Sequence, residues 1–450
     1  FTFYLREDAC WTDEDETPVT AADFVFAFRR ALNPGTGSDL GRTLTCIANG
    51  QQVLDGQADP SELGVTALDS KTLKIDLAYS YEDFPNLMAS SAAMPCNEKF
   101  FTESQGQYGL EAGTTLGNGP YTFSTSYSWT HGESISLSRN SLYAGEQKPV
   151  PAGISFTIGA EIMNSANAIA NGTVDAAPIT GEQLEAAHAA DMNLTSFEDT
   201  ALGVCFNMQD SVFQNANIRS AFLKTLNREQ VLSSLPENYS QAQSVIPPQT
   251  TLSGENYRTL AGECSLPAYE QGQGKAYLEA GLNELQLDSL PKVTILCLDS
   301  PGAKAIVNNL LENWNSALGY YLNLNAVSEN ELQSALRNGN YQLALCPLRA
   351  DNDGPWELLN LFSSENPYNP AGYQNQDYNN LLSQIKASPG EDGAALCLQA
   401  ENHLIQNLVF YPLVYEKRYF ASAQNVTGII FHPYNGGIDF IGAEKTEAEA

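Results

Sequence analysis

The residues with the clearest chemical potential follow one apolar run. Residues 341–346 are expected to form a strand, and the loop after it carries Arg349, Asp351 and Asp353 before Pro355. Ligands of open α/β sheets bind beyond the carboxyl ends of the strands. A carboxylate in such a place needs a cationic partner once a closing cleft removes its water. Asp351 is therefore the candidate for binding a ligand ammonium group, and capping of the next helix by Asp351 or Asp353 is an equally good interpretation.

Other chemistries lack the residues that they require. An EF-hand calcium loop over 349–360 needs an acidic residue where Arg349 stands and a glutamate where Asn360 stands. Residues 272–275 lack the glycine spacing and the hydroxyl residue of a phosphate-binding loop. The four histidines are not paired at metal-ligand spacing, and no nucleophile or zinc-protease motif occurs. The sequence predicts no catalytic site, no metal and no cofactor.

The charge of the chain argues against several partners. Asp and Glu number 53 against 22 Lys and Arg, which gives a formal net charge of -31. Phosphate backbones and anionic lipid surfaces repel such a chain, so nucleic-acid binding is not expected. The eight cysteines form no C-x-x-C pair, and sequence determines neither their pairing nor their oxidation state. No apolar run reaches the length of about 20 residues that a membrane span needs.

The first third has an α+β pattern. Thr20 and Asp23 form a capping box for a helix whose apolar face carries Phe24, Phe28 and Leu32, and residues 33–35 end that helix. Two alternating runs, 65–68 and 72–77, then predict a hairpin.

Two later regions follow a β-α-β pattern. In the first, strands at 154–158 and 174–179 flank a helix at 161–170. In the second, strands at 293–298, 320–327 and 341–346 alternate with helices at 303–318 and from Ser328 to Gly339. Such units build parallel sheets. We therefore expect two separate open α/β sheets and hence two lobes.

Colinear similarity along nearly the whole chain points to one family. The sequence resembles the solute-binding proteins of ABC importers for oligopeptides, dipeptides and nickel (family 5), and it favours their oligopeptide branch. The matching segments are 1–12, 17–34, 62–65, 69–77, 117–123, 139–143, 213–222, 226–228, 245–248 and 349–355.

The resemblance implies a periplasmic-binding-protein-like (type II) α/β clamshell of two lobes with an additional α+β domain. The additional domain would span 1–116, the first lobe 117–203 with 424–450, and the second lobe 204–423. Crossing strands near Phe206 and Ser422 would act as hinges. Because Phe1 begins within a strand-like run, we expect a leader and part of the amino-terminal domain to precede it. That part would include a strand facing the ligand.

The family also implies a function and a site. Asp351 would pair with the terminal ammonium of a short peptide, and Leu348, Arg349 and Ala350 would offer main-chain groups. The remaining residues assigned to the ligand site are Asn352, Trp356, Phe206 and Asn207. The protein would be a monomeric, non-enzymatic component that delivers peptides to an ABC permease and ATPase. It would work in the periplasm or, lipid-anchored, on the extracellular face of the cytoplasmic membrane.

Some alternatives stay open on the sequence. Some relatives carry a cysteine where Arg349 stands, and this arginine could meet a peptide carboxylate or be a simple surface residue. The ligand could be a non-peptide solute such as a sugar or a metal chelate, although the shortage of histidine disfavours nickel. A sensor or interaction protein on the same fold is a further alternative.

Overall fold

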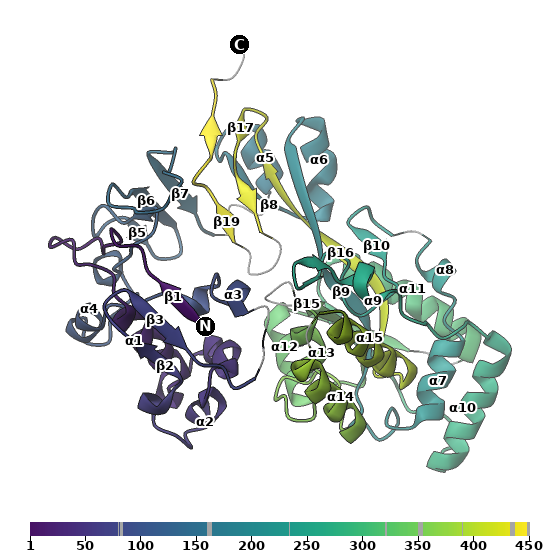
Figure 1. Cartoon of the computed structure of the whole chain (residues 1–450). Coiled ribbons are helices and arrows are strands. Elements are labelled where there is room, and N and C mark those ends of the chain that lie inside the picture. Colours follow the sequence, from purple (N-terminus) through teal and green to yellow (C-terminus); the bar gives the residue numbers. More distant parts are fainter. Residues whose placement is uncertain are drawn as a thin grey trace. The chain divides into compact units, whose positions relative to one another are not determined.

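Tertiary contacts divide the chain into two compact units (Figure 1). Unit 1 comprises Phe1–Thr195 with Phe420–Ala450, and unit 2 comprises Ser196–Tyr419. The chain passes between the units within two strands, β9 (Asn193–Phe206) and β16 (Phe410–Ser422). The structure is a computed structural model that describes residues 1–79, 81, 84–159, 164–233, 235–319, 322–349, 354–388, 390–432 and 437–447.

The amino-terminal part of unit 1 is built around a three-stranded antiparallel sheet in the order β1-β3-β2. Helix α1 packs against β2 and β3, and the core between them includes Phe28, Leu73 and Phe84 (Figure 1). The elements of this part are β1 (Thr2–Tyr4), α1 (Ala21–Leu32), η1 (Pro34–Thr36), η2 (Asp39–Cys46), α2 (Gly50–Leu54), η3 (Pro60–Glu62), β2 (Val65–Ala67), β3 (Thr72–Ile75), α3 (Phe84–Leu87), η4 (Ser91–Ala93), α4 (Glu98–Glu103) and η5 (Ala112–Thr114).

Local signals in this part are confirmed. The N–H of Thr20 donates to the Asp23 carboxylate at 2.7 Å, and α1 ends at Leu32 as expected. Phe28 and Leu32 are fully buried. Strands β2 and β3 form the predicted hairpin, with Ala67 opposite Leu73.

The first predicted β-α-β unit does not form a parallel sheet, and that expectation is wrong. Strand β7 pairs antiparallel with β6 in a four-stranded sheet that also holds β4 and β5, whereas β8 pairs with β16. The two strands were predicted correctly, but their partners lie elsewhere in the chain. The elements of this region are β4 (Tyr121–Thr122), β5 (Trp129–Thr130), β6 (Ser134–Arg139), β7 (Gly153–Thr157), α5 (Ser165–Ala170), β8 (Ala176–Ile179), η7 (Gly181–Gln183), α6 (Leu184–Ala189), β17 (Val426–Thr427), β18 (Ile430–Phe431), β19 (Ile438–Asp439) and β20 (Glu444–Lys445).

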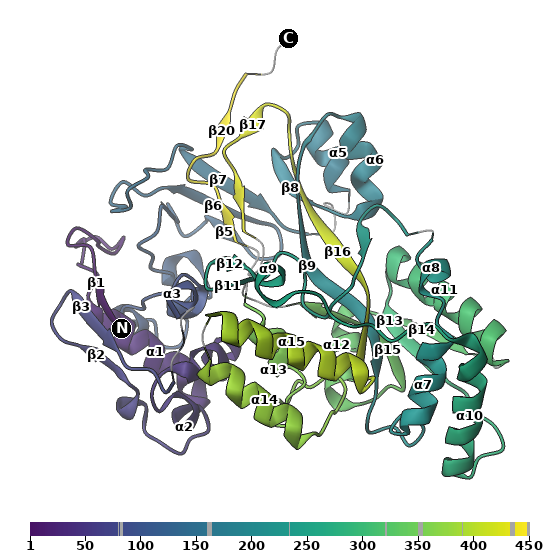
Figure 2. The same cartoon turned by 45° about the vertical axis from the view of Figure 1, so that its right-hand side comes forward.

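Unit 2 contains a sheet in the order β10-β16-β9-β15-β13-β14. Helices α11 and α12 connect its parallel strands, and α13, α14 and α15 pack on one another (Figure 2). The elements of this unit, besides β9 and β16, are α7 (Ala216–Lys224), α8 (Arg228–Val231), β10 (Tyr239–Gln241), β11 (Thr251–Leu252), β12 (Glu255–Asn256), α9 (Tyr257–Ala261), α10 (Gln271–Leu285), β13 (Thr294–Leu298), α11 (Pro301–Leu318), β14 (Asn323–Val327), α12 (Glu329–Asn338), β15 (Leu343–Arg349), α13 (Trp356–Asn360), α14 (Gln376–Ala387) and α15 (Gly390–Gln406).

The second β-α-β pattern is confirmed. Strands β14 and β15 both pair parallel with β13. The large apolar α11 residues Ile306, Leu310 and Trp314 are fully buried. Helix α12 has the predicted bounds: Ser328 and Glu331 form a capping box at its start, and Gly339 ends it with a left-handed φ of 65°. Local sequence therefore positions β15, the strand that leads to the candidate site.

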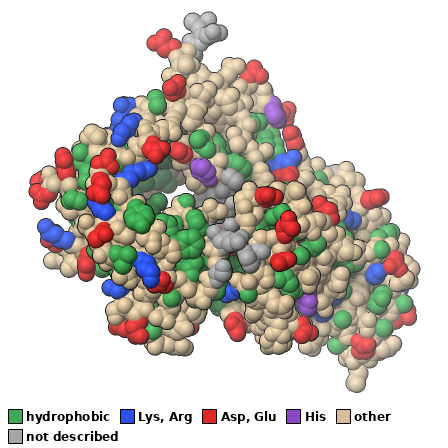
Figure 3. Space-filling model, viewed as in Figure 1, with side chains coloured by type: hydrophobic (Ala, Val, Ile, Leu, Met, Phe, Trp, Pro, Cys, Tyr) green, Lys and Arg blue, Asp and Glu red, His purple; other side chains and the backbone are tan. Residues whose placement is uncertain are grey.

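The surface reflects the acidic composition. Carboxylates are spread over the visible face and outnumber the basic side chains there (Figure 3). Within the described residues, no helix is both long and apolar enough to cross a membrane.

Candidate ligand-binding site

Strand β15 has one continuous partner and one partial partner. It pairs antiparallel with β9 along its whole length, from Leu343 opposite Phe206 to Arg349 opposite Thr200. On its other side, β13 pairs only with Leu343 and Ala344. The last residues of β15 therefore have a paired edge toward β9 and, on the β13 side, an edge that β13 does not cover.

The direction of the ladder determines which main-chain groups lie on that second edge. The Asn207 N–H donates to the Gln342 carbonyl at 3.1 Å, so the hydrogen-bonded pairs of β15 with β9 recur at every second residue from Gln342. The main chain of Leu348 is thus directed toward β9. The main chains of Pro347 and Arg349 are directed away from it, toward the uncovered edge.

Proline fits this arrangement because it has no N–H to leave unpaired. It occurs in sheets mainly where its nitrogen faces an open edge. Within the described residues, neither Pro347 nor Arg349 has a backbone hydrogen-bond partner on the uncovered side. The Arg349 N–H and the carbonyls of Pro347 and Arg349 are the groups that an added strand could use.

The side chains at this strand end differ in exposure. Leu348 is 2% exposed and belongs to the packed interior, whereas Arg349 is exposed. Arg349 stands opposite Thr200, and directly opposed residues of an antiparallel pair share one face of the sheet. The Arg349 side chain makes no hydrogen bond or ion pair with the described residues.

The carboxylates nearest in this register already have cationic partners. Asp199 is fully buried and accepts hydrogen bonds from the Arg418 guanidinium, with Nε to Oδ1 at 2.9 Å. The Thr200 hydroxyl donates to the same Asp199 oxygen at 3.1 Å. Glu198 lies 3.9 Å from the Lys417 ammonium. These pairs leave the Arg349 cation without a protein counter-ion among the described residues.

The other residues assigned to the site from the sequence are not gathered here. Ala350, Asp351 and Asn352 lie outside the described residues. The half-buried Trp356 is the first residue of α13, and its ring centroid lies 4.8 Å from the Lys386 ammonium.

Phe206 and Asn207 lie at the opposite end of β15. Phe206 is fully buried against Phe213 and Phe222. The Asn207 amide donates to the carbonyls of Gly339 and Tyr341, at 2.9 and 2.6 Å, so both of its N–H groups have partners. The structure therefore brings together Leu348 and Arg349 among the described site residues.

Sequence reasoning missed the charged pair at the start of the buried part of β9. Asp199 precedes an apolar run, and a carboxylate beside such a run is a signal for a buried partner. That partner, Arg418, is 219 residues away along the chain, so no local spacing identifies it.

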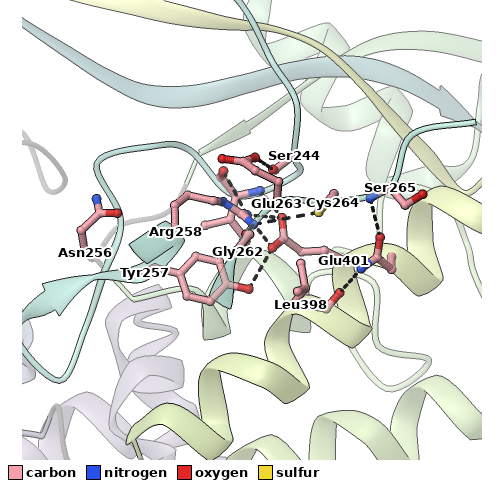
Figure 4. A network of polar contacts seen from close by, with 12 residues as sticks. Ser244, Asn256, Tyr257, Arg258, Gly262, Glu263, Cys264, Ser265, Leu398 and Glu401 are labelled. Carbon is pink, nitrogen blue, oxygen red and sulfur yellow. Dashed lines mark hydrogen bonds and ion pairs between the residues drawn. The ribbon is translucent and has the colours of Figure 1, made fainter. Parts of the chain in front are cut away.

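A buried polar network joins the segment 244–265 to helix α15 (Figure 4). The Arg258 guanidinium donates to both oxygens of the fully buried Glu401, and the Tyr257 hydroxyl donates to Glu401 at 2.8 Å. Burial raises the pKa of Tyr257 well above its usual value, so this hydroxyl stays protonated as a donor.

The same segment is joined to both crossing strands. The Glu198 N–H on β9 donates to the Gln249 side chain at 2.6 Å, and the Ser244 N–H donates to the hydroxyl of Tyr415 on β16 at 3.1 Å. Burial also raises the pKa of the Cys264 thiol to about 12, so it is protonated at neutral pH. The network thus holds the segment 244–265 against α15 and both crossing strands.

This fold, with a mixed sheet in which β15 extends beyond its pairing with the parallel strand β13, is that of a solute-binding protein. A sequence model of the bacterial extracellular solute-binding proteins, family 5, matches residues 1–370, and the chain belongs to this family. Members of the family are extracellular or periplasmic substrate-binding proteins.

Individual relatives are similar along almost the whole chain. The dipeptide-binding protein DppE of Bacillus subtilis is 28% identical over 99% of this chain and 81% of its own length. The oligopeptide-binding protein OppA of the same organism is 26% identical over 98% of this chain and 81% of its own length. The fold matches that of Listeria monocytogenes OppA bound to peptide with a TM-score of 0.78, at 22% identity, over 99% of this chain and 87% of that one.

Proposed function

We propose that this protein captures short peptides and delivers them to the permease of an ABC importer. Relatives that match almost the whole of this chain are named as dipeptide- and oligopeptide-binding proteins, which supports a peptide as the solute. The proposal includes a lipid anchor or a periplasmic location, and a role in binding rather than in catalysis.

The observation that carries the proposal is the uncovered edge at the end of β15. A peptide that lies along Pro347 and Arg349 can pair with their main-chain groups as an added strand. Main-chain pairing does not depend on side-chain identity, because every peptide offers the same N–H and C=O groups. Such a site suits a protein that accepts many peptide sequences.

Asp351 is proposed to hold the terminal ammonium of the peptide. This role rests on the sequence match at 349–355 and on its position just beyond the end of β15. A carboxylate that loses water needs a cationic partner, and the peptide terminus supplies one. The proposed orientation therefore places the amino end of the peptide beyond Arg349 along the direction of β15.

The proposed domains are 1–116, 117–203 with 424–450, and 204–423. Closure of the two lobes over the peptide would be a hinge motion that ligand contacts bias. The crossing strands β9 and β16 carry both proposed hinge residues, Phe206 and Ser422.

Thermal unfolding with peptides tests the function directly. A ligand that binds only the folded state raises the midpoint, by an amount equivalent to about 2.7 kcal/mol at a concentration of 100 Kd. We expect di- to pentapeptide mixtures to raise the midpoint and mono- or disaccharides to leave it unchanged. A shift with sugars and none with peptides contradicts the proposal.

A further inference from the structure

Arg349 is an exposed cation at the uncovered edge of β15, and within the described residues it has no counter-ion. We propose that Arg349 gives the peptide site a preference for a carboxylate side chain on the ligand residue that lies opposite it. This inference rests on the proposed function, since it requires a peptide along the end of β15.

The geometry follows from strand pairing. A peptide added beside β15 places one of its residues directly opposite Arg349, and the two side chains then project from the same face of the sheet. On the other side of Arg349, the same face carries Thr200, which is only 5% exposed and whose hydroxyl donates to Asp199. Thr200 therefore adds neither charge nor bulk that would block an acidic side chain beside Arg349.

The charge arrangement explains why the described carboxylates nearest in the β9–β15 register do not neutralise this arginine. The neighbouring carboxylates Asp199 and Glu198 are paired with Arg418 and Lys417. Acidic residues outnumber basic ones by 53 to 22, so a cation that has no counter-ion among the described residues is not a consequence of a shortage of carboxylates. A planar guanidinium also binds a carboxylate through two parallel hydrogen bonds, so Arg349 should favour a carboxylate over a neutral side chain.

Two sources could supply the carboxylate, an acidic side chain or the carboxyl terminus of the peptide. Peptides amidated at the carboxyl terminus separate the two, because a glutamate is then their only carboxylate. The test uses amidated tetra-alanine and the four variants that carry Glu at one position, each compared with its Gln counterpart. Affinities are measured by isothermal titration calorimetry on the wild-type protein, Arg349→Gln and Lys275→Gln.

We expect one position at which Glu binds roughly two- to fivefold more tightly than Gln, the range of a cross-strand ion pair. In Arg349→Gln this ratio falls to one while the Gln peptide keeps its affinity. Lys275→Gln is the matched control, since Lys275 is an exposed α10 residue without a partner among the described residues, and its removal changes the net charge equally. It should leave the ratio unchanged.

The outcomes distinguish this inference from the proposed function. If the wild-type protein binds none of the peptides, amidated or free, the proposed function and this inference are both wrong. If peptides bind but no position favours Glu, or the preference persists in Arg349→Gln, only the inference is overturned. It is also overturned if Arg349→Gln weakens free tetra-alanine and spares its amide, because Arg349 would then bind the terminal carboxylate. Equal melting midpoints of the three proteins establish that the variants are folded.

Discussion

Arg258 binds both carboxylate oxygens of Glu401, and this carboxylate has no exposure to solvent. The Arg258 side chain is itself 11% exposed. An ion pair so far from water leaves a buried, uncompensated charge when one partner is removed, which costs about 3–5 kcal/mol. The pair joins helix α15 to helix α9, so its loss should be felt in the whole of unit 2.

We therefore expect Glu401→Gln to lower the free energy of unfolding by about 3–5 kcal/mol, measured by urea titration. The control is Asp76→Asn, which removes an ion pair with Lys74 in which both side chains are about half exposed. Exposed pairs contribute less than about 1 kcal/mol, so this variant should stay close to the wild type. Equal losses in the two variants would show that the Arg258–Glu401 pair is no more important than a surface pair.

Gly203 lies in β9 directly opposite Cys346, three residues before the end of β15. A Cβ at this position would lie 2.5 Å from the Tyr411 carbonyl oxygen and closer still to the Phe410 ring. Gly203→Ala should therefore push β9 and β16 apart and destabilise the protein by about 1–3 kcal/mol, as overpacking does.

The matched control for Gly203→Ala is Gly272→Ala. Gly272 is the second residue of α10, and an added Cβ there meets no atom within 4 Å. Alanine in a helix is favoured over glycine by up to about 1 kcal/mol, so this variant should be neutral or slightly more stable. Chemical denaturation of both variants measures the contrast. A Gly203→Ala protein as stable as Gly272→Ala would mean that β9 and β16 have room between them.

The sequence predicted elements better than it predicted their partners. The helix caps at Thr20 and Ser328 each depend on two residues three positions apart, so a short stretch of sequence is enough to predict them. Strand β7 was also predictable from its own residues. Its antiparallel pairing with β6 was not, because the pattern of one strand does not determine which other strand pairs with it. The prediction for the second region was confirmed because a helix connects each strand to the next, and such a crossover makes the successive strands parallel.

The proposed site was predictable to the same limited extent. Its place at the end of β15 follows from a general property of α/β sheets, and Arg349 was named from the sequence. The uncovered edge depends on the residue at which β13 stops pairing with β15. The carboxylate of Asp199 is unavailable to Arg349 because it is paired with Arg418, which is distant in sequence. Both are long-range contacts, which local periodicity does not encode.

His403 should make stability fall in mild acid. Its pKa is lowered, chiefly by burial, with the Asp377 carboxylate acting in the opposite direction. Its Nε2 lies 2.8 Å from the Tyr373 hydroxyl, and burial raises the pKa of Tyr373 to about 12, so this phenol remains protonated. The folded state thus favours the neutral imidazole, and the unfolded chain binds the proton more readily.

The stabilisation from neutral His403 is complete above the unfolded pKa of about 6.5 and is lost as the pH falls toward the lower folded pKa. We expect the wild-type protein to lose more stability between pH 7.5 and pH 5 than His403→Gln does. Urea titrations at both pH values measure this difference, and carboxylates that titrate in both proteins cancel from it. Identical pH dependence in the two proteins would exclude His403 as a source of acid sensitivity.

Asp351→Asn should remove the preference for a free peptide amine. Loss of one partner of a buried charge pair costs about 2–5 kcal/mol in binding, which is a decrease in affinity of roughly 30-fold or more. The expected result is a large loss for free tetra-alanine, while N-acetylated tetra-alanine, already weak with the wild-type protein, loses little more. Calorimetry with both peptides measures the two ratios.

Asp353→Asn is the control for this prediction, because it removes a carboxylate two residues away in the same loop. It should bind both peptides as the wild-type protein does. If Asp353→Asn instead shows the large loss and Asp351→Asn does not, the ammonium partner is Asp353. If neither variant changes the ratio between free and acetylated peptide, no carboxylate in this loop holds the amine. The peptide would then be oriented by the main chain of β15 alone.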